Sequence, residues 1–253
     1  MAGLFENKVI IVTGGGGAIG RAAALGFAAA GGKVAVADLV ESAASATVEI
    51  IRGAGGEAMA IAGDMSQAAD VEAMVEKTVH RYGQLDCAFN NAGITHPHDA
   101  AWDESVFRKI IDTNLISQML CLKFEIPRML ARGKGAICNM SSVLGLVGQR
   151  APVVQGYSAS KHAIIGLTKT AALQYAASNI RINALCPGVT RSPIVDAAMS
   201  VSEELRAHLS NYAPLRGIAE PAEIAEAAIW LCSDKASFVT GHSLVADGGY
   251  TAQ

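Results

Sequence analysis

Residues 9–20 read VIIVTGGGGAIG, and this stretch decides the fold. Residues 9–12 are β-branched and apolar, which predicts a short strand buried on both faces. Glycines in the following turn let the backbone bend sharply and come close to a ligand. The alanine-rich residues 21–30 then predict a helix, whose N-terminus offers unpaired N–H groups to a phosphate. A strand, a glycine-rich turn and a helix in this order indicate a nucleotide-binding unit.

The alternation of strand and helix continues through the chain. Further strands are predicted at 33–37, 57–61, 85–89, 135–140, 181–185 and 243–246, and further helices at 42–52, 70–82, 102–132, 158–177 and 221–232. Strands joined by helical crossovers run parallel, and such connections are right-handed. We expect one doubly wound α/β domain of the Rossmann type over residues 1–253, with a parallel seven-stranded sheet and helices on both faces.

The composition excludes several classes of protein. The chain has 253 residues, of which 51% are apolar and 17% charged, and this suits a large packed core. Its net charge of -3 provides no basic surface for nucleic acid. The five cysteines form no CxxC pair, and the sequence shows neither a signal peptide nor an apolar run of bilayer length. We expect a cytoplasmic protein whose partner is a small molecule, not nucleic acid or a membrane.

Asp38, at the end of the second predicted strand, is the first candidate for cofactor selectivity. An acidic side chain at this place usually binds the ribose hydroxyls of NAD, and it would repel the additional phosphate of NADP. Leu39 follows where an NADP enzyme often has a basic residue, so the two residues predict NAD. The alternative for Asp38 is a helix-capping carboxylate.

Three motifs together resemble the short-chain dehydrogenase/reductase family: TGGGGAIG at 13–20, NNAG at 90–93 and YxxxK at 157–161. The resemblance spans essentially the whole chain, and it departs from the family pattern at Ala18, where a second glycine is usual. It implies hydride exchange with NAD and places a set of residues along that cofactor. The set comprises Gly14, Gly17, Ala18, Ile19, Gly20, Asp64, Met65, Asn91, Ala92, Gly93, Tyr157, Lys161, Pro187, Gly188, Thr190 and Ser192.

Tyr157 is the candidate for proton transfer. Oxidation of an alcohol to a ketone needs a group that takes the hydroxyl proton. Lys161 lies one helical turn further on, so both side chains share a helix face. A tyrosine pKa near 10 must fall by about three units, or roughly 4 kcal/mol, to operate near neutral pH. A positive charge about 4 Å away supplies roughly that much at an effective dielectric constant of about 20, so we predict that Lys161, helped by a positively charged nicotinamide, lowers the pKa of Tyr157.

The same resemblance implies two further catalytic residues. Ser142 matches the serine that hydrogen-bonds the substrate oxygen. Its spacing to Tyr157 is two residues longer than is common, so Ser141 stays an alternative. Asn114 matches the asparagine that holds a water for proton transfer to Lys161, and its alternative is a structural residue at a helix kink.

Residues 190–217, here called the lid, follow the expected nicotinamide-binding segment, and the resemblance implies that they cover the substrate. Ser200 and Glu203 predict a capping box at the start of a short helix in the lid. Apolar walls are expected from Leu144, Val153, Val154, Ile194, Val195, Met199, Leu205, Leu209 and Tyr212. The predicted reaction is the NAD(H)-dependent interconversion of a hydrophobic secondary alcohol and its ketone.

Two other functions stay open, a 3-oxoacyl thioester reductase and a non-catalytic NAD-binding sensor. The resemblance also implies a homotetramer, in which the helices after the fourth and fifth strands pair between subunits. The sequence shows no constellation for a catalytic metal. The C-terminal Gln253 resembles the tail of relatives that bind magnesium there, and this site stays an open alternative.

Overall fold

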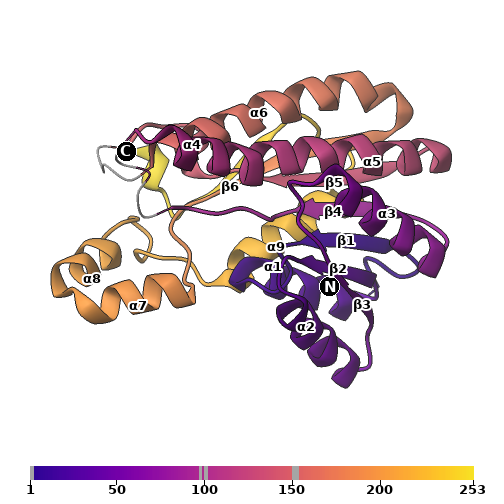
Figure 1. Ribbon diagram of the computed structural model, residues 1–253, viewed down its shortest axis with the longest axis horizontal. Coiled ribbons are helices and arrows are strands. Elements are labelled where there is room, and N and C mark those ends of the chain that lie inside the picture. Colours follow the sequence, from indigo (N-terminus) through magenta and orange to yellow (C-terminus); the bar gives the residue numbers. More distant parts are fainter. Residues whose placement is uncertain (1–2, 97–98, 100–101, 150–153) are drawn as a thin grey trace.

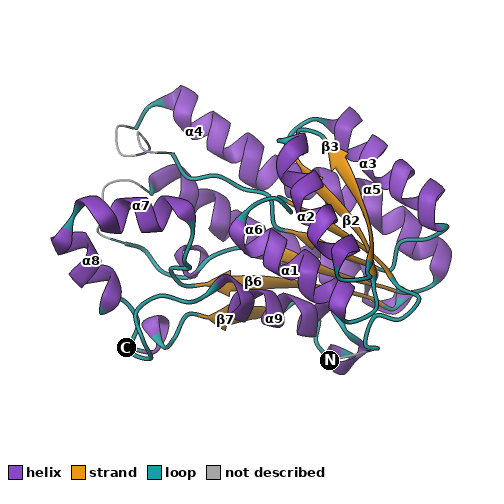
Figure 2. Cartoon of the chain, turned by 90° about the horizontal axis from the view of Figure 1, so that it is seen from below, coloured by secondary structure: helices purple, strands orange, loops and turns teal. Residues whose placement is uncertain are grey.

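The computed structural model describes residues 3–96, 99, 102–149 and 154–253. Its strands form one parallel seven-stranded sheet in the order β3-β2-β1-β4-β5-β6-β7 (Figures 1 and 2). The strands span Val9–Thr13 (β1), Lys33–Asp38 (β2), Glu57–Ala62 (β3), Cys87–Asn90 (β4), Gly135–Met140 (β5), Ile180–Pro187 (β6) and Ser243–Ala246 (β7). The strand order reverses between β1 and β4, which confirms the predicted doubly wound fold.

Helices cover both faces of the sheet (Figure 1). One face carries α1 (Ala18–Ala29), α2 (Glu41–Gly53) and α9 (Pro221–Cys232), and the other carries α3 (Ala68–Tyr82), α5 (Ser117–Arg132) and α6 (Gln155–Tyr175). The remaining α-helices are α4 (Glu104–Ile111), which packs against α6, and the two lid helices, α7 (Pro193–Val201) and α8 (Glu203–Ser210). The lid helices stand beyond the sheet, at the side where β6 ends (Figures 1 and 2).

The strand β1 shows why its sequence is apolar throughout. Ile10 and Val12 belong to the core beneath α1, α2 and α9, whereas Ile11 belongs to the core beneath α3, α5 and α6. All three side chains are fully buried. Burial of each such side chain contributes roughly 1.5–3 kcal/mol, so both layers of helices are held by the same strand.

The predicted helix at 102–132 was wrong as a single element. Trp102 has a positive φ of 54°, and Asp103 caps a helix that begins only at Glu104. A π-helical segment, Asp112–Ile116, then separates α4 from α5. The extra residue of this turn carries the buried side chain of Asn114 to Ile94, whose backbone N–H and C=O it binds.

The lid also differs from its prediction. Ser200 and Glu203 do not form a capping box, because Ser200 lies inside α7 and donates to the carbonyl of Ala197. Ser202 has extended backbone geometry, which ends α7, and its hydroxyl caps α8 by accepting from the N–H of Leu205. The lid therefore contains two short helices with a sharp corner between them.

Two helices, α1 and α6, have no side-chain cap at the N-terminus, and both begin before the predicted residue. The helix α1 begins at Ala18, three residues before its prediction, because Gly17 serves as N-cap with its backbone alone. The helix α6 spans Gln155–Tyr175 where 158–177 was predicted. Among the helices of the described residues, none combines the length and the apolarity that a bilayer span requires.

Glu125 of α5 is a fully buried carboxyl group inside this core. The side-chain amide of Asn90 donates to one Glu125 oxygen at 3.1 Å and to the amide oxygen of Asn139 at 3.1 Å. The other Glu125 oxygen and the amide oxygen of Asn90 have no donor. Burial raises the pKa of Glu125 to about 7, opposed by the hydrogen bond from Asn90. A proton on this carboxyl group would give one of the unpaired oxygens a donor.

The variant Glu125→Gln is expected to change how stability depends on pH. Because the pKa of Glu125 is raised from 4.5 to about 7 on folding, its contribution is present below pH 4.5 and is lost as the pH rises through 7. Glutamine has a hydrogen-bond donor and an acceptor, as the protonated carboxyl group of Glu125 does, but it does not titrate. The free energy of unfolding would be measured with urea at pH 5 and at pH 8. From the lower to the higher pH, the value for the variant should rise relative to that for the wild type by on the order of 3 kcal/mol.

The exposed Glu226 of α9 provides the matched control. Glu226→Gln should leave the difference between the two pH values unchanged. An equal stability difference between wild type and Glu125→Gln at both pH values would contradict the raised pKa.

Candidate functional site

One large cavity of about 910 Å³ lies where the strands of the sheet end. Its walls include all the predicted catalytic and cofactor-binding residues except Asn114. The predicted residues that line it are Gly14, Gly17, Ala18, Ile19, Gly20, Asp38, Leu39, Asp64, Met65, Asn91, Ala92, Gly93, Ser142, Tyr157, Lys161, Pro187, Gly188, Thr190 and Ser192. The fold therefore brings together segments that are up to 178 residues apart, from Gly14 to Ser192.

The glycine-rich turn has the geometry of a cradle for a phosphate group. Gly14 has a positive φ of 63°, which glycine adopts without strain. A Cβ atom on Gly20 would fall on the carbonyl oxygen of Gly14, so the turn and α1 pack without room for a side chain. No side chain caps the N-terminus of α1, whose first residues line the cavity. The free N–H groups of this first turn fit a pyrophosphate.

Asp38 lies at the rim of the same cavity, at the end of β2. One carboxylate oxygen accepts from the N–H of Gly16 at 2.9 Å, and the other accepts from the N–H of Val40 at 3.0 Å. The N-cap of α2 is Val40, so Asp38 is not the capping residue of that helix. Leu39 is 71% exposed next to it. A carboxylate at this place could bind the hydroxyls of a ribose.

Thr13 is a residue of the site that the sequence interpretation missed. Its hydroxyl accepts from the N–H groups of Asn91 and Ala92, both at 3.0 Å. The amide of Asn91 in turn donates to the carbonyl of Thr13 at 3.0 Å. These bonds join the end of β1 to the end of β4 and hold the glycine-rich turn beside the NNAG turn. The signal was present, since Thr13 opens the motif at 13–20.

Tyr157, Ser142 and Lys161 meet at the centre of the cavity. The Lys161 ammonium lies 5.4 Å from the centre of the Tyr157 ring and donates to the carbonyl of Met140 at 2.9 Å. Ser142 hydrogen-bonds the Tyr157 hydroxyl, which lowers the pKa of the tyrosine. Ser141 instead donates to the backbone carbonyl of Lys161 at 2.8 Å, so its hydroxyl is directed away from Tyr157. This arrangement favours Ser142 over Ser141 as the partner of Tyr157.

The two pKa shifts differ from the predicted pattern. Burial raises the pKa of Tyr157 above 10, and this outweighs the hydrogen bond from Ser142. Desolvation is the larger effect in the chain by itself, and the predicted lowering of this pKa by Lys161 together with a bound nicotinamide stays a prediction. Burial also lowers the pKa of Lys161 to about 8, so part of its charge is lost near neutral pH.

Asn114 lies beneath the cavity and not in its wall. The side chain is fully buried in the π-helical segment, and it accepts from the N–H of Ile94 at 2.7 Å. Its amide donates to the carbonyl of Ile94 and to the hydroxyl of Ser160 in α6. Asn114 thus lies in a helix irregularity, which is where the structural alternative placed it. Its side chain also connects the segment after β4 to the helix of Tyr157.

The segment after β6 closes the other side of the cavity. The hydroxyl of Thr190 donates to the carbonyl of Gly188 at 3.2 Å. The hydroxyl of Ser192 accepts from the N–H of Val195 and caps α7. Its own proton remains able to reach a ligand, because the cap uses the hydroxyl as an acceptor. This segment therefore joins the cofactor part of the cavity to the lid.

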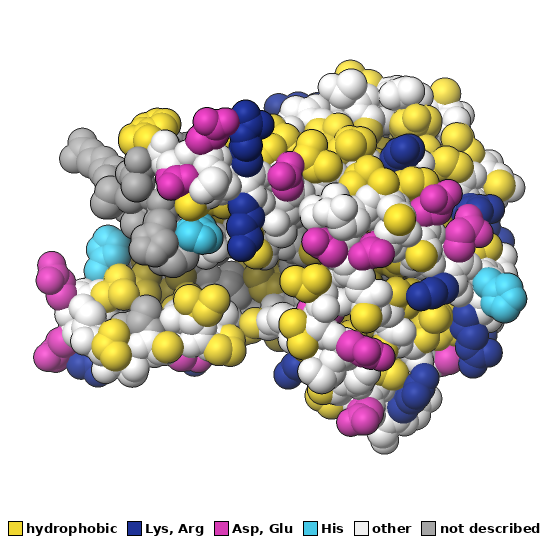
Figure 3. All heavy atoms as spheres, in the orientation of Figure 1, with side chains coloured by type: hydrophobic (Ala, Val, Ile, Leu, Met, Phe, Trp, Pro, Cys, Tyr) yellow, Lys and Arg dark blue, Asp and Glu magenta, His cyan; other side chains and the backbone are white. Residues whose placement is uncertain are grey.

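The lid and the turn after β5 form apolar walls around the rest of the cavity. Most of the predicted wall residues line it, namely Leu144, Val154, Ile194, Val195, Leu205, Leu209 and Tyr212. Met199 does not line the cavity, and Val153 lies outside the described residues. Figure 3 shows apolar side chains gathered along the lid helices. The ring of Tyr212 stacks on Tyr250 at 4.3 Å, which fastens the end of the lid to the C-terminal turn.

Several cavity residues were not predicted, among them Ile94 and Thr95 after β4, Gln149 after β5 and His208 of α8. Each lies in a segment whose shape depends on tertiary contacts, so no local pattern marks it. They add three polar groups to otherwise apolar walls.

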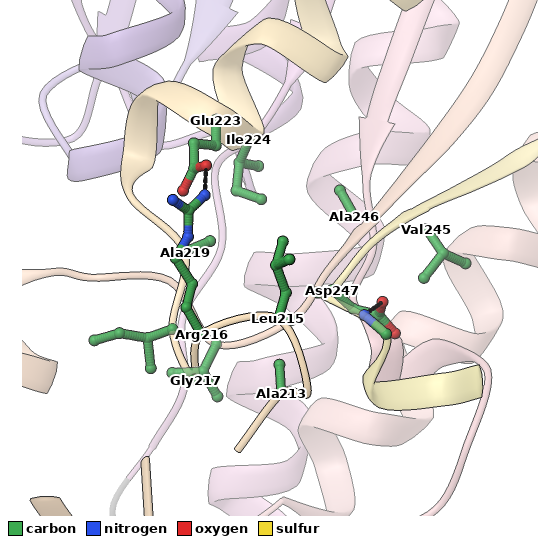
Figure 4. A pocket seen from close by; sticks show the side chains of 15 residues that line it. Ala213, Leu215, Arg216, Gly217, Ala219, Glu223, Ile224, Val245, Ala246 and Asp247 are labelled. Carbon is green, nitrogen blue, oxygen red and sulfur yellow. Dashed lines mark hydrogen bonds and ion pairs between the residues drawn. The ribbon is translucent and has the colours of Figure 1, made fainter. Parts of the chain in front are cut away.

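A second cavity of about 300 Å³ lies behind the lid and shares Gly188 and Val189 with the large one. Figure 4 shows the ion pair of Arg216 and Glu223 on one side of it and Asp247 on the other. Asp247 accepts from the N–H groups of Gly249 and Thr251. The charged groups of this cavity are thus already partnered within the chain.

In the part of the chain that the structure describes, no group of three or more His, Cys, Asp or Glu side chains could hold a metal ion. Gln253 is exposed at the C-terminus.

Comparison with known proteins places this site in a family. A family model described as enoyl-(acyl carrier protein) reductase matches residues 16–251. A 2,5-dichloro-2,5-cyclohexadiene-1,4-diol dehydrogenase of Sphingobium indicum is 44% identical over 250 residues, covering 98% of both chains. A cyclohexanol dehydrogenase of an Acinetobacter species is 39% identical over 255 residues, covering 100% of this chain and 98% of the relative.

A solved structure is also similar to this chain over nearly its whole length. The crystal structure of a 3-oxoacyl-[acyl-carrier protein] reductase with bound NAD from Brucella melitensis superposes with a TM-score of 0.88 at 32% identity, covering 98% of this chain and 93% of that one. The motifs, the parallel sheet and these full-length similarities agree, and the chain belongs to the short-chain dehydrogenase/reductase family of oxidoreductases.

Proposed function

We propose that the protein interconverts an apolar secondary alcohol, most suitably a ring alcohol, and its ketone with NAD as cofactor. The observation that carries this proposal is the position of Tyr157, Ser142 and Lys161 in one cavity, between the glycine-rich turn and the apolar walls of the lid. The relatives named as dehydrogenases of cyclohexanol and of a chlorinated cyclohexadiene diol support a ring alcohol as substrate.

The cofactor would be held by five parts of the cavity. The N-terminus of α1 fits the pyrophosphate, Asp38 the adenine-side ribose, and Asp64 and Met65 the surroundings of the adenine. Asn91 to Gly93, and Pro187, Gly188, Thr190 and Ser192, would line the nicotinamide half. A bound nicotinamide supplies the hydride acceptor or donor. The NAD-bound relative from Brucella melitensis is consistent with this assignment.

Tyr157 is proposed to move the proton of the reaction. In alcohol oxidation its phenolate would accept the hydroxyl proton of the substrate, and in ketone reduction its hydroxyl would return that proton. Ser142 would donate a hydrogen bond to the substrate oxygen and thereby stabilise charge that develops there. Lys161 would stabilise the phenolate with its positive charge. Asn114 would keep the helix of Tyr157 in position through its bond to Ser160.

A panel of substrates tests the proposed function. Absorbance at 340 nm would be followed with NAD or NADP and with cyclic alcohols, linear secondary alcohols and 3-hydroxyacyl thioesters. We expect the highest kcat/KM with NAD and a cyclic secondary alcohol, because the walls offer apolar area to a compact ring. Preference for the thioesters would establish the 3-oxoacyl reductase alternative, and NAD binding without turnover across the panel would favour the sensor.

The charges around the lid support the ring alcohol over the thioester. An acyl carrier protein is acidic and would need unpaired basic residues near the entrance. The three arginines of the lid each pair with carboxylates of this chain. Arg191 pairs with Asp196 and Glu220, Arg206 with Glu203, and Arg216 with Glu223.

We also propose a cytoplasmic homotetramer. All five cysteines are buried and free, which suits a reducing compartment. Exposed apolar side chains on the two long helices α5 and α6 support pairing between subunits, among them Met119, Leu130 and Leu173.

Tyr157→Phe is expected to lower kcat by at least about 1,000-fold, because the ring stays and the proton acceptor is lost. Binding of NAD, measured by fluorescence titration, should change less than about twofold. Ser158→Ala, one residue away, serves as the control and should keep the activity of the wild type. Turnover by Tyr157→Phe near that of the wild type would overturn the assignment.

The pH profile should report Tyr157 and Lys161 as a coupled pair. Alcohol oxidation needs the phenolate, whose pKa burial raises, so kcat/KM should rise with pH, whereas ketone reduction should fall. The ammonium of Lys161, with a pKa of about 8, favours the phenolate below that pH. In Lys161→Met, the rise of kcat/KM for alcohol oxidation should therefore occur at higher pH than in the wild type. A rise at the same pH would argue against stabilisation of the phenolate by Lys161.

Asp38→Ala is expected to weaken the preference for NAD. Loss of a charge-assisted hydrogen bond to the ribose should lower kcat/KM for NAD by roughly 10- to 100-fold. Removal of the negative charge should at the same time improve kcat/KM for NADP. The comparison is made between both cofactors at one alcohol concentration, with Asp64→Ala as the second variant. An unchanged ratio of NAD to NADP in Asp38→Ala would show that Asp38 does not select the cofactor.

A further inference from the structure

The helix that carries Tyr157 and Lys161 has no cap of its own. The N-cap residue of α6 is Val154, and no side-chain hydrogen bond caps this terminus locally. The carboxylate of Asp99 lies there instead, 55 residues earlier in the sequence. Its two oxygens accept from the N–H of Gly156 at 2.8 Å and from the N–H of Tyr157 at 3.0 Å. These are the N–H groups that a capping side chain normally binds.

The contact is enclosed and leaves little freedom. Asp99 is only 3% exposed, and Gly156 is buried against it. A Cβ atom on Gly156 would lie 3.0 Å from an Asp99 oxygen and 3.2 and 3.3 Å from Phe107 and Ile110 of α4. A buried negative charge at a helix N-terminus is favoured by the helix dipole and by both hydrogen bonds. The first turn of α6 is therefore clamped between Asp99 and α4.

Asp99 also connects the two halves of the site. The segment after β4 includes Ala92 and Gly93, which line the cavity, and Asn114 holds it at Ile94. Asn114 binds α6 through Ser160, and Asp99 binds the same helix one turn earlier, at Tyr157 itself. Two points of attachment fix a helix in rotation as well as in position. One point alone would let the Tyr157 side chain swing relative to the wall formed by Ala92 and Gly93.

We propose that Asp99 is a positioning residue for the reaction, which sets the Tyr157 hydroxyl at its place opposite the NNAG turn. It is absent from the wall of the cavity, so it would act through the backbone of Tyr157 and not by contact with substrate or cofactor. The inference rests on the proposed role of Tyr157 in proton transfer.

The test compares Asp99→Asn and Asp99→Ala with a matched control. Asp103 also accepts from two backbone N–H groups, those of Ser105 and Val106, but with a single oxygen, and it caps α4 and is exposed. Asparagine at position 99 keeps the size, removes the charge and leaves one good acceptor. We expect Asp99→Asn to lower kcat by at least about tenfold, with KM for NAD within about twofold of the wild type, since small misplacements of a reacting group are costly. Asp103→Asn should leave both constants within about twofold.

A second readout separates positioning from a loss of folded protein. With a substrate deuterated at the carbinol carbon, the isotope effect on kcat should rise in Asp99→Asn, because the chemical step becomes slower relative to product release. Thermal unfolding of each variant gives the folded fraction. Even if Asp99→Ala fails to fold, Asp99→Asn decides the question.

Each outcome bears on the inference separately from the proposed function. Reduced kcat with a raised isotope effect in folded Asp99→Asn supports it. Unchanged kcat in that variant, or a fall in kcat that follows the folded fraction with an unchanged isotope effect, overturns it. Tyr157→Phe is measured beside it: an inactive Tyr157→Phe with a normal Asp99→Asn removes only the inference about Asp99, whereas an active Tyr157→Phe removes the proposed function itself.

Discussion

The burial of the Lys161 ammonium is the constraint on which the rest of the site depends. The side chain is 2% exposed, and a charge out of water is unstable unless polar groups surround it. The carbonyl of Met140, at the end of β5, accepts its hydrogen bond, and Ser141 binds the Lys161 carbonyl in turn. These two bonds fix α6 against the end of the sheet. Tyr157, one turn earlier on α6, takes its position from the same contacts.

Desolvation favours the neutral form of both Lys161 and Tyr157. It lowers the pKa of Lys161 and raises that of Tyr157, so each group is driven toward its neutral form. A neutral tyrosine holds the proton that ketone reduction consumes, whereas alcohol oxidation must generate the phenolate against this bias. Ser142, whose hydrogen bond lowers the pKa of Tyr157, is the group of this chain that works in the other direction. The balance between the two directions of reaction is therefore set by burial as much as by the lysine charge.

The sequence predicted the fold well because each strand of a parallel sheet must be apolar on both faces. The predictions for β5 and β7 and for α9 were correct at both ends, since glycine, proline and polar residues bound them. The segment around Asn114 could not be predicted in this way. A π-helical turn has no local sequence signal, so the chain from 102 to 132 was interpreted as one helix.

The candidate site was predictable to the extent that its residues follow strand ends in recognisable motifs. The Asp99 cap was not, because its partner helix lies more than fifty residues away and a capping rule inspects only the local sequence. The raised pKa of Tyr157 in the chain by itself was not predictable for a related reason: the charge of Lys161 is visible in the sequence, whereas the loss of water around Tyr157 depends on the complete fold.

The division of the cavity follows from where charges can be kept. Backbone N–H groups and Asp38 supply polarity along the cofactor half, where α1 begins and β2 ends. The arginines of the lid instead pair with carboxylates of the lid and of the start of α9, and the lid turns Leu205, Leu209 and Tyr212 toward the cavity. A substrate that carries a charge would have to break one of these pairs or remain unpaired in an apolar wall. The uncharged ring alcohol that we propose as substrate would meet neither cost, because its hydroxyl would reach Tyr157 and Ser142 while the ring would contact the lid.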